Sequence, residues 1–110
     1  MNTDLSYLES MTEGDKGLIK ELIGIFSTQV EEYSAQMQKF LVDQNWGELS
    51  KLAHKAKSTV AIMGMKDLSE ILKQLELLAK EGKEVDSYSA MIDLFSSECK
   101  IAVAELKLYK

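Results

Sequence analysis

The absence of proline from all 110 residues is the feature that most constrains the fold of this chain. Proline breaks helices, because its ring fixes φ and it has no N–H to donate. The chain is also rich in Leu, Ala, Glu, Lys, Met and Gln, which lose little side-chain freedom in a helix. These features predict an all-α protein. We expect residues 1–110 to form one domain with a core of its own.

Apolar residues recur at spacings of three and four, which is the period of an amphipathic helix. A short first helix is expected to place Leu5, Leu8 and Met11 on one face. A long second helix is expected from about residue 15 to residue 43. Its predicted buried face comprises Leu18, Leu22, Ile25, Phe26, Gln29, Tyr33, Met37, Phe40 and Leu41.

A third main helix is expected to begin near Trp46, because Asn45 and Glu48 resemble a capping box. Gly64 is expected to end it, since glycine readily adopts the left-handed conformation that follows a helix. Its predicted apolar face comprises Trp46, Leu49, Leu52, Ala53, Ala56, Val60 and Met63.

Two more helices follow. One covers the Leu-rich segment 68–79 and is closed by Gly82, and the last is expected to be capped by Asp86 and to extend to Leu106. Four long helices with short connections pack most simply as an antiparallel up-down four-helix bundle. The short N-terminal helix would then lie as a lid on the bundle.

Charge and composition disfavour several classes of function. All thirteen basic residues are lysines and the net charge is −5, which disfavours a nucleic-acid partner. No stretch approaches the roughly 20 apolar residues of a membrane span, so we expect a soluble, cytoplasmic protein. The lone Cys99 has no second thiol for a disulfide or a metal site.

The single histidine, His54, is the strongest indication of function. On the third helix it lies roughly 130° from the centre of the apolar face, so it is expected to face solvent. Lys57 lies one turn later, beside the small Ser58 and Ala61. Neutral imidazole is a nucleophile near physiological pH, and an ammonium beside it can balance the charge of a phosphoryl group. This setting favours a carrier of phosphoryl groups that has no nucleotide pocket of its own.

At these positions the chain resembles the histidine-containing phosphotransfer (HPt) domain of multistep two-component phosphorelays. Two positions depart from the family's commonest pattern: Ala56 replaces the usual leucine and Ser58 the usual glycine, although both side chains are small. Because the position after the lysine takes glycine or another small residue, the matching residues are His54, Lys57, Ser58, Thr59 and Gly64, after a Leu-Ala pair that often precedes the histidine.

The resemblance implies a four-helix bundle in which His54 accepts a phosphoryl group and Lys57 stabilises its charge. The implied partners are the receiver domains of response regulators and a hybrid sensor histidine kinase. The protein would be a monomeric phosphocarrier without kinase activity or a cofactor, and Mg²⁺ would belong to the receiver. We expect the docking face to comprise Ser58, Ala61, Ile62, Gly64 and Met65, with Ile62 and Met65 adding apolar contacts.

Two other classes of protein remain as alternatives. A haem-binding helical bundle would use His54 and a methionine as iron ligands, which requires the histidine to point inward. A structural adaptor, or a degenerate HPt domain, would keep the fold without the chemistry. A visible absorption spectrum tests the first alternative, and incubation with a phosphorylated receiver tests the second.

Overall fold

The computed structural model describes residues 3–108, and helices joined by short turns make up that range. This architecture confirms the predicted all-α class and the short N-terminal helix. The helices are α1 (Ser6–Met11), α2 (Lys16–Val42), α3 (Trp46–Ile62), α4 (Lys66–Glu81) and α5 (Tyr88–Leu106), with a 3₁₀ turn, η1 (Val85–Ser87), before the last.

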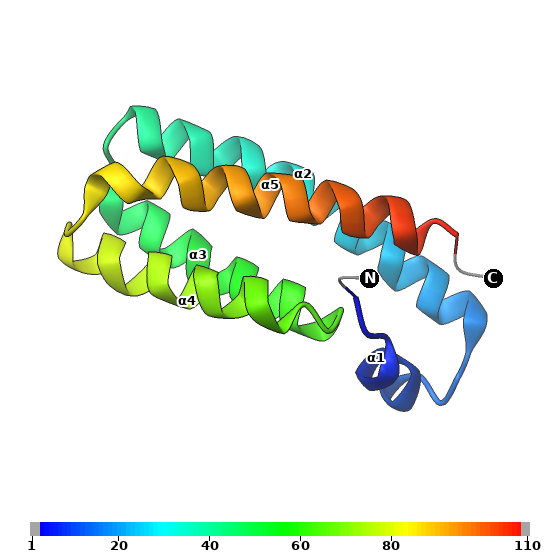
Figure 1. The fold of residues 1–110 in the computed structure, drawn as a ribbon. Coiled ribbons are helices and arrows are strands. Elements are labelled where there is room, and N and C mark those ends of the chain that lie inside the picture. The colour runs from blue at the N-terminus through cyan, green and yellow to red at the C-terminus, as the bar shows by residue number, and fades with distance from the viewer. Residues whose placement is uncertain (1–2, 109–110) are drawn as a thin grey trace.

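The four long helices form an elongated bundle (Figure 1), and the whole molecule measures about 42 × 21 × 19 Å. Each of them contacts two of the others: α3 packs on α4, α2 on α5, α2 on α3, and α4 on α5. Helix α1 lies at one end of the bundle, close to the turn between α3 and α4 (Figure 1). Within residues 3–108, no helix is both long enough and apolar enough to cross a membrane.

Side-chain caps fix the start of two of the long helices. The Asp15 carboxylate accepts a hydrogen bond from the Leu18 N–H at 3.1 Å, and the Asn45 side chain accepts one from the Glu48 N–H at 3.3 Å. The start of α3 at Trp46 is therefore confirmed. The predicted cap at Asp86 is wrong, because residues 85–87 form the 3₁₀ turn and α5 begins without a side-chain cap.

The predicted core face of α3 is confirmed in outline, and α4 and α5 each bury an apolar stripe as well. The buried apolar side chains of α3, α4 and α5 are Leu49, Leu52, Ala53, Ala56, Val60, Leu68, Leu72, Leu75, Ala79, Tyr88, Ile92, Phe95, Cys99, Ala102 and Leu106. These positions recur every three or four residues, so each helix buries one stripe against its two neighbours.

The predicted core face of α2 is wrong at its N-terminal end. Leu18 and Ile25 are 40% and 48% exposed, whereas Ile19, Ile23 and Val30 are buried in their place. Apolar residues are dense along this helix, so two adjacent stripes both fit the helical period. Packing against α3 and α5 decides which stripe is buried. Similarly, α1 buries Leu8 but leaves Met11, which was expected on the same face, 51% exposed.

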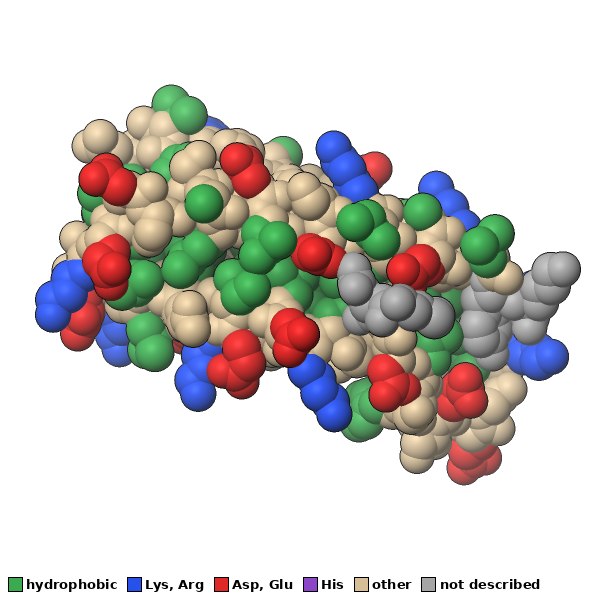
Figure 2. Space-filling model, in the orientation of Figure 1, with side chains coloured by type: hydrophobic (Ala, Val, Ile, Leu, Met, Phe, Trp, Pro, Cys, Tyr) green, Lys and Arg blue, Asp and Glu red, His purple; other side chains and the backbone are tan. Residues whose placement is uncertain are grey.

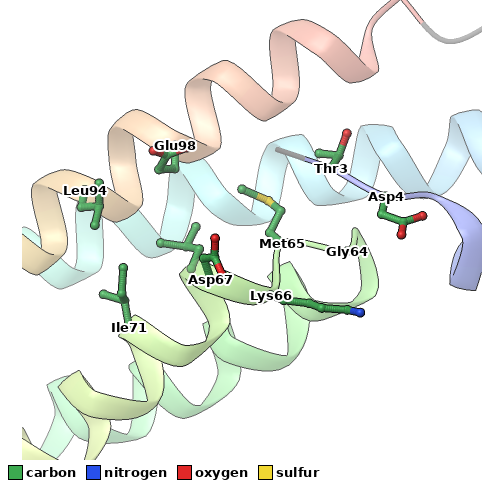
Figure 3. Close-up of a pocket in the computed structure, with 10 residues that line it drawn as sticks. Thr3, Asp4, Gly64, Met65, Lys66, Asp67, Ile71, Leu94 and Glu98 are labelled. Carbon is green, nitrogen blue, oxygen red and sulfur yellow. The ribbon is translucent and has the colours of Figure 1, made fainter. Parts of the chain in front are cut away.

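The N-terminal segment crosses the turn between α3 and α4 and binds to its backbone (Figure 3). The Asp4 N–H donates a hydrogen bond to the Met63 carbonyl at 2.9 Å. Gly64 follows with φ of +76°, and a Cβ at this position would collide with the backbone N and O of Asp4. Residue 64 must therefore lack a side chain for two reasons: the left-handed backbone and the close approach of the N-terminal segment.

Candidate functional site

His54 lies in the middle of α3 on the side turned away from the core. Its side chain is 61% exposed, which confirms the outward orientation expected from the helical period. Buried stripe residues such as Ala53 and Ala56 hold α3 against the bundle and leave the imidazole at the surface. This orientation argues against the haem alternative, which needs an inward histidine.

A carboxylate on the neighbouring helix bridges the two expected site residues. Glu76 of α4 lies with Oε2 at 2.9 Å from the His54 Nδ1 and with Oε1 at 3.1 Å from the Lys57 Nζ. Its side chain is 22% exposed and that of Lys57 is 26% exposed, so the bridge is half-buried beside the exposed ring. Glu76 was not among the site residues expected from the sequence, although a helical wheel of α4 places it beside the buried stripe once α4 is paired with α3.

The charge of Glu76 determines which imidazole nitrogen carries the proton. Burial acts to raise the pKa of Glu76, but hydrogen bonds from Lys57 and His54, together with their charges, lower the pKa below its ordinary value. An ionised carboxylate can only accept hydrogen bonds, so the His54 Nδ1 must be the donor. A neutral ring then carries its lone pair on Nε2, the nitrogen that does not contact Glu76.

Two hydroxyl groups hold α3 and α4 in register around this bridge. The Ser50 hydroxyl donates to the backbone carbonyl of Glu76 at 2.8 Å, and the Ser69 hydroxyl donates to the carbonyl of Lys57 at 3.3 Å. Each bond ties a side chain of one helix to the backbone of the other at a residue of the bridge. The distance between His54 and Glu76 is thus fixed by the backbone and not only by their own contact.

The sequence matches a family model described as the Hpt domain over residues 21–107. The chain belongs to the Hpt domain family. It is also 31% identical over 81 residues to the phosphorelay intermediate protein YPD1 of Candida albicans. That match covers 74% of this chain and 42% of the relative, so the chain spans less than half of that protein's length. No solved structure matches the chain significantly.

Three of the expected docking residues of this Hpt domain are at the surface. Ser58 and Ala61 are exposed on the strip of α3 that carries His54, and Ile62 at the end of the helix is 38% exposed. Gly47 lies seven residues before His54 as Ala61 lies seven after it, so small residues flank the imidazole along the helix in both directions.

Of the other two expected docking residues, Met65 is buried and Gly64 is only partly accessible. Met65 is only 3% exposed, because the chain reverses after Gly64 and directs this side chain into the core (Figure 3). Gly64 is half-buried because Asp4 lies against it. The N-terminal segment, and not an open surface, occupies this part of the predicted docking face.

An apolar hollow that was not expected from the sequence lies near Ile62. It is formed where α1, α2 and the end of α3 meet, and its exposed rim comprises Met11, Ile25 and Ile62. Met11 and Ile25 were expected on the buried faces of their helices. Because both are exposed, they form an apolar surface patch together with Ile62, one of the expected docking residues.

We found no cluster that could hold a metal ion among the His, Cys, Asp and Glu side chains of residues 3–108. The carboxylate beside the imidazole, Glu76, is already hydrogen-bonded to His54 and Lys57.

Proposed function

We propose that this Hpt domain is a phosphocarrier in a multistep phosphorelay. His54 accepts a phosphoryl group from the aspartate of one receiver domain and transfers it to the aspartate of another. The observation that carries the proposal is the bond from the His54 Nδ1 to Glu76, since it leaves the exposed Nε2 with the lone pair that a nucleophile needs.

The transfer step follows from this arrangement. The Nε2 lone pair attacks phosphorus, an N–P bond forms, the P–O bond to the aspartate breaks, and the aspartate leaves as a carboxylate. The ring retains its Nδ1 proton and becomes cationic, so the Glu76 carboxylate stabilises it. The reverse sequence delivers the phosphoryl group to the next aspartate.

Lys57 supports the same step from one turn along the helix. Its ammonium is held at 3.1 Å from Glu76, within reach of a phosphoryl group on the ring of His54. It balances the negative charge that arrives with phosphorus. The domain needs no cofactor and no kinase activity of its own, because the receiver binds the Mg²⁺ and brings the reactive acyl phosphate.

The partners we propose are response-regulator receiver domains and a hybrid sensor histidine kinase. The small residues Ser58 and Ala61 leave room for a partner's active site to reach the imidazole. The apolar rim at Met11, Ile25 and Ile62 adds a contact of the kind found at the centre of transient interfaces.

The scaffold in this proposal is an antiparallel up-down arrangement of α2 to α5 within a single domain. Its support is the shortness of the connections at residues 43–45, 63–65 and 82–87, which favour neighbouring helices of opposite direction. The course of the chain in Figure 1 agrees with this arrangement.

The test is incubation of the protein with phosphorylated receiver domains of the source organism, together with the His54→Gln variant. We expect acid-labile phosphate on the wild type and none on His54→Gln, with equal helicity and melting temperature because an exposed ring is lost. Label on His54→Gln would contradict the role of His54. Absence of label on the wild type with every receiver would favour the adaptor alternative.

A further inference from the structure

A groove crosses the exposed face of α3 on the Trp46 side of His54. Four lysines from three helices line it: Lys39 of α2, Lys51 and Lys55 of α3, and Lys80 of α4. Gly47 lines the groove without a side chain, and a Cβ at this position would meet no atom within 4 Å. His54 lines the same groove, which therefore reaches the imidazole.

Three of these lysines have no carboxylate partner of their own. Among residues 3–108, Lys39, Lys55 and Lys80 form no ion pair, and all three are exposed. Lys51 pairs with Glu48 at 3.4 Å, but both side chains are at least half exposed, so water screens this pair.

The charge of the groove is opposite to that of the whole chain. The groove is lined by two carboxylates, Glu48 and Glu76, and Glu76 already binds His54 and Lys57. A local excess of positive charge beside the site stands out in a chain of net charge −5. By contrast, Figure 2 shows carboxylates beside the apolar seam between α4 and α5.

We propose that this lysine groove docks an acidic surface of the receiver domain, a proposal that rests on the proposed function. The group that must reach Nε2 is an aspartyl phosphate, and a site that binds Mg²⁺ is built mainly from carboxylates. The partner surface around it is thus anionic, and lysines without internal partners complement it. Charge complementarity of this kind raises the rate of encounter and selects among partners.

The groove also fixes the orientation of the partner. The apolar rim near Ile62 lies beyond the C-terminal side of His54 on α3, whereas the lysine groove extends from His54 and its neighbour Lys55 toward Gly47 on the N-terminal side. A receiver with acidic and apolar patches on opposite sides of its aspartate matches this face in one direction only. The reverse orientation would place carboxylates on the apolar rim, where their desolvation is unfavourable.

The experiment compares two triple variants with the same change in net charge. The first is Lys39→Gln, Lys55→Gln and Lys80→Gln, in which glutamine avoids placing a negative charge in the last turns of α2 and α4. The control is Lys20→Gln, Lys100→Gln and Lys107→Gln, which removes three exposed lysines from α2 and from the C-terminal part of the chain. Melting temperature and helicity are measured for both.

For transfer from a phosphorylated receiver at low ionic strength, we expect the groove variant to raise KM about tenfold with kcat unchanged. This difference should shrink toward zero near 1 M salt, where the Debye length is about 3 Å. The control variant should match the wild type. Equal KM values and equal salt dependence for the groove variant and the wild type would overturn the inference, as would an equal loss in the control.

Binding of unphosphorylated receivers, measured by calorimetry, separates this inference from the proposed function. His54→Gln should bind with the salt dependence of the wild type but accept no phosphoryl group. If the wild type transfers no phosphate yet binds receivers through the groove lysines, the proposed function fails and the groove stands. If transfer occurs and the groove variant binds normally, the groove fails and the function stands.

Discussion

The seam between α3 and α4 differs from the seam between α2 and α5 in the charge of the side chains that cross it. The first is crossed by the ionic bridge of His54, Glu76 and Lys57. The second is crossed by a hydroxyl pair, Ser34 with Ser96, and by a weak bond from the Gln38 amide to Asp93 at 3.4 Å.

The pKa shifts of Cys99 and Glu76 strengthen this contrast between the two seams. Beside the hydroxyl pair, burial raises the pKa of Cys99 to about 12, so its thiol stays protonated and unreactive. Beside the ionic bridge, the lowered pKa of Glu76 keeps a carboxylate next to an exposed nucleophile. Similar polar contacts between helices thus stabilise packing in one seam and prepare a reactive group in the other. Only the α3–α4 seam combines an ionic bridge with an exposed nucleophile.

The most severe test of this comparison places one bulky side chain beside each seam. Ala61→Trp should abolish phosphorylation by receivers, because an indole on the strip of His54 blocks the approach of the partner. Ser97→Trp, on the exposed side of α5, should leave transfer unchanged. Both variants should keep their helicity, measured by circular dichroism. Equal transfer by the two variants would place the docking face elsewhere.

Removal of the bridging carboxylate should have the next largest effect. Glu76→Ala should slow transfer roughly tenfold to a hundredfold, the equivalent of one charge-assisted hydrogen bond of about 1.5–3 kcal/mol. Glu76→Gln should be intermediate, because its carbonyl oxygen can still accept from Nδ1 without the charge. Single-turnover rates measure both variants.

The matched control is Asp93→Ala, which removes a carboxylate from the other seam and should not change the transfer rate. A wild-type rate for Glu76→Ala would show that the ionic bridge is as inert as the hydroxyl pair.

Lys57→Ala should have a smaller effect. We expect transfer to slow several-fold, or the phosphohistidine to hydrolyse sooner, because one balancing charge is lost. The melting temperature should change little, since a pair near the surface contributes about 0–1 kcal/mol to stability. Lys100→Ala on α5 is the control. Unchanged kinetics in Lys57→Ala would make Lys57 an ordinary solvated lysine.

The smallest effect is expected from the double variant Ser34→Ala and Ser96→Ala. Removal of both partners of a neutral hydrogen bond leaves no buried group unsatisfied, so the free energy of unfolding should change by less than about 1 kcal/mol. Transfer rates should equal those of the wild type. Urea denaturation and the same single-turnover assay check the two expectations, and slower transfer would give the α2–α5 seam a role in the chemistry.

The sequence predicts those parts of this molecule that depend on helical period. The existence of the helices and the outward position of His54 follow from spacings within a single segment. Glu76 could not be assigned in this way, because its partners lie on another helix and the pairing of α3 with α4 decides the contact. Met65 was misplaced because the turn at Gly64 restarts the period.

Contacts between helices, which the sequence does not reveal, also explain why the buried face of α2 was predicted incorrectly. Its apolar positions are dense enough for two stripes, and only the positions of α3 and α5 select Ile19 and Ile23 over Leu18 and Ile25.

The contact of Asp4 with Met63 and Gly64 also bears on where the folding unit begins. The family match starts at residue 21, yet Leu8 and Ile19 are completely buried and the N-terminal segment is bonded to the α3–α4 turn. Each of these two side chains contributes about 1.5–3 kcal/mol through burial. A domain of this size has about 5–15 kcal/mol of net stability, so a fragment cut at the family boundary would lack a large share of what keeps it folded.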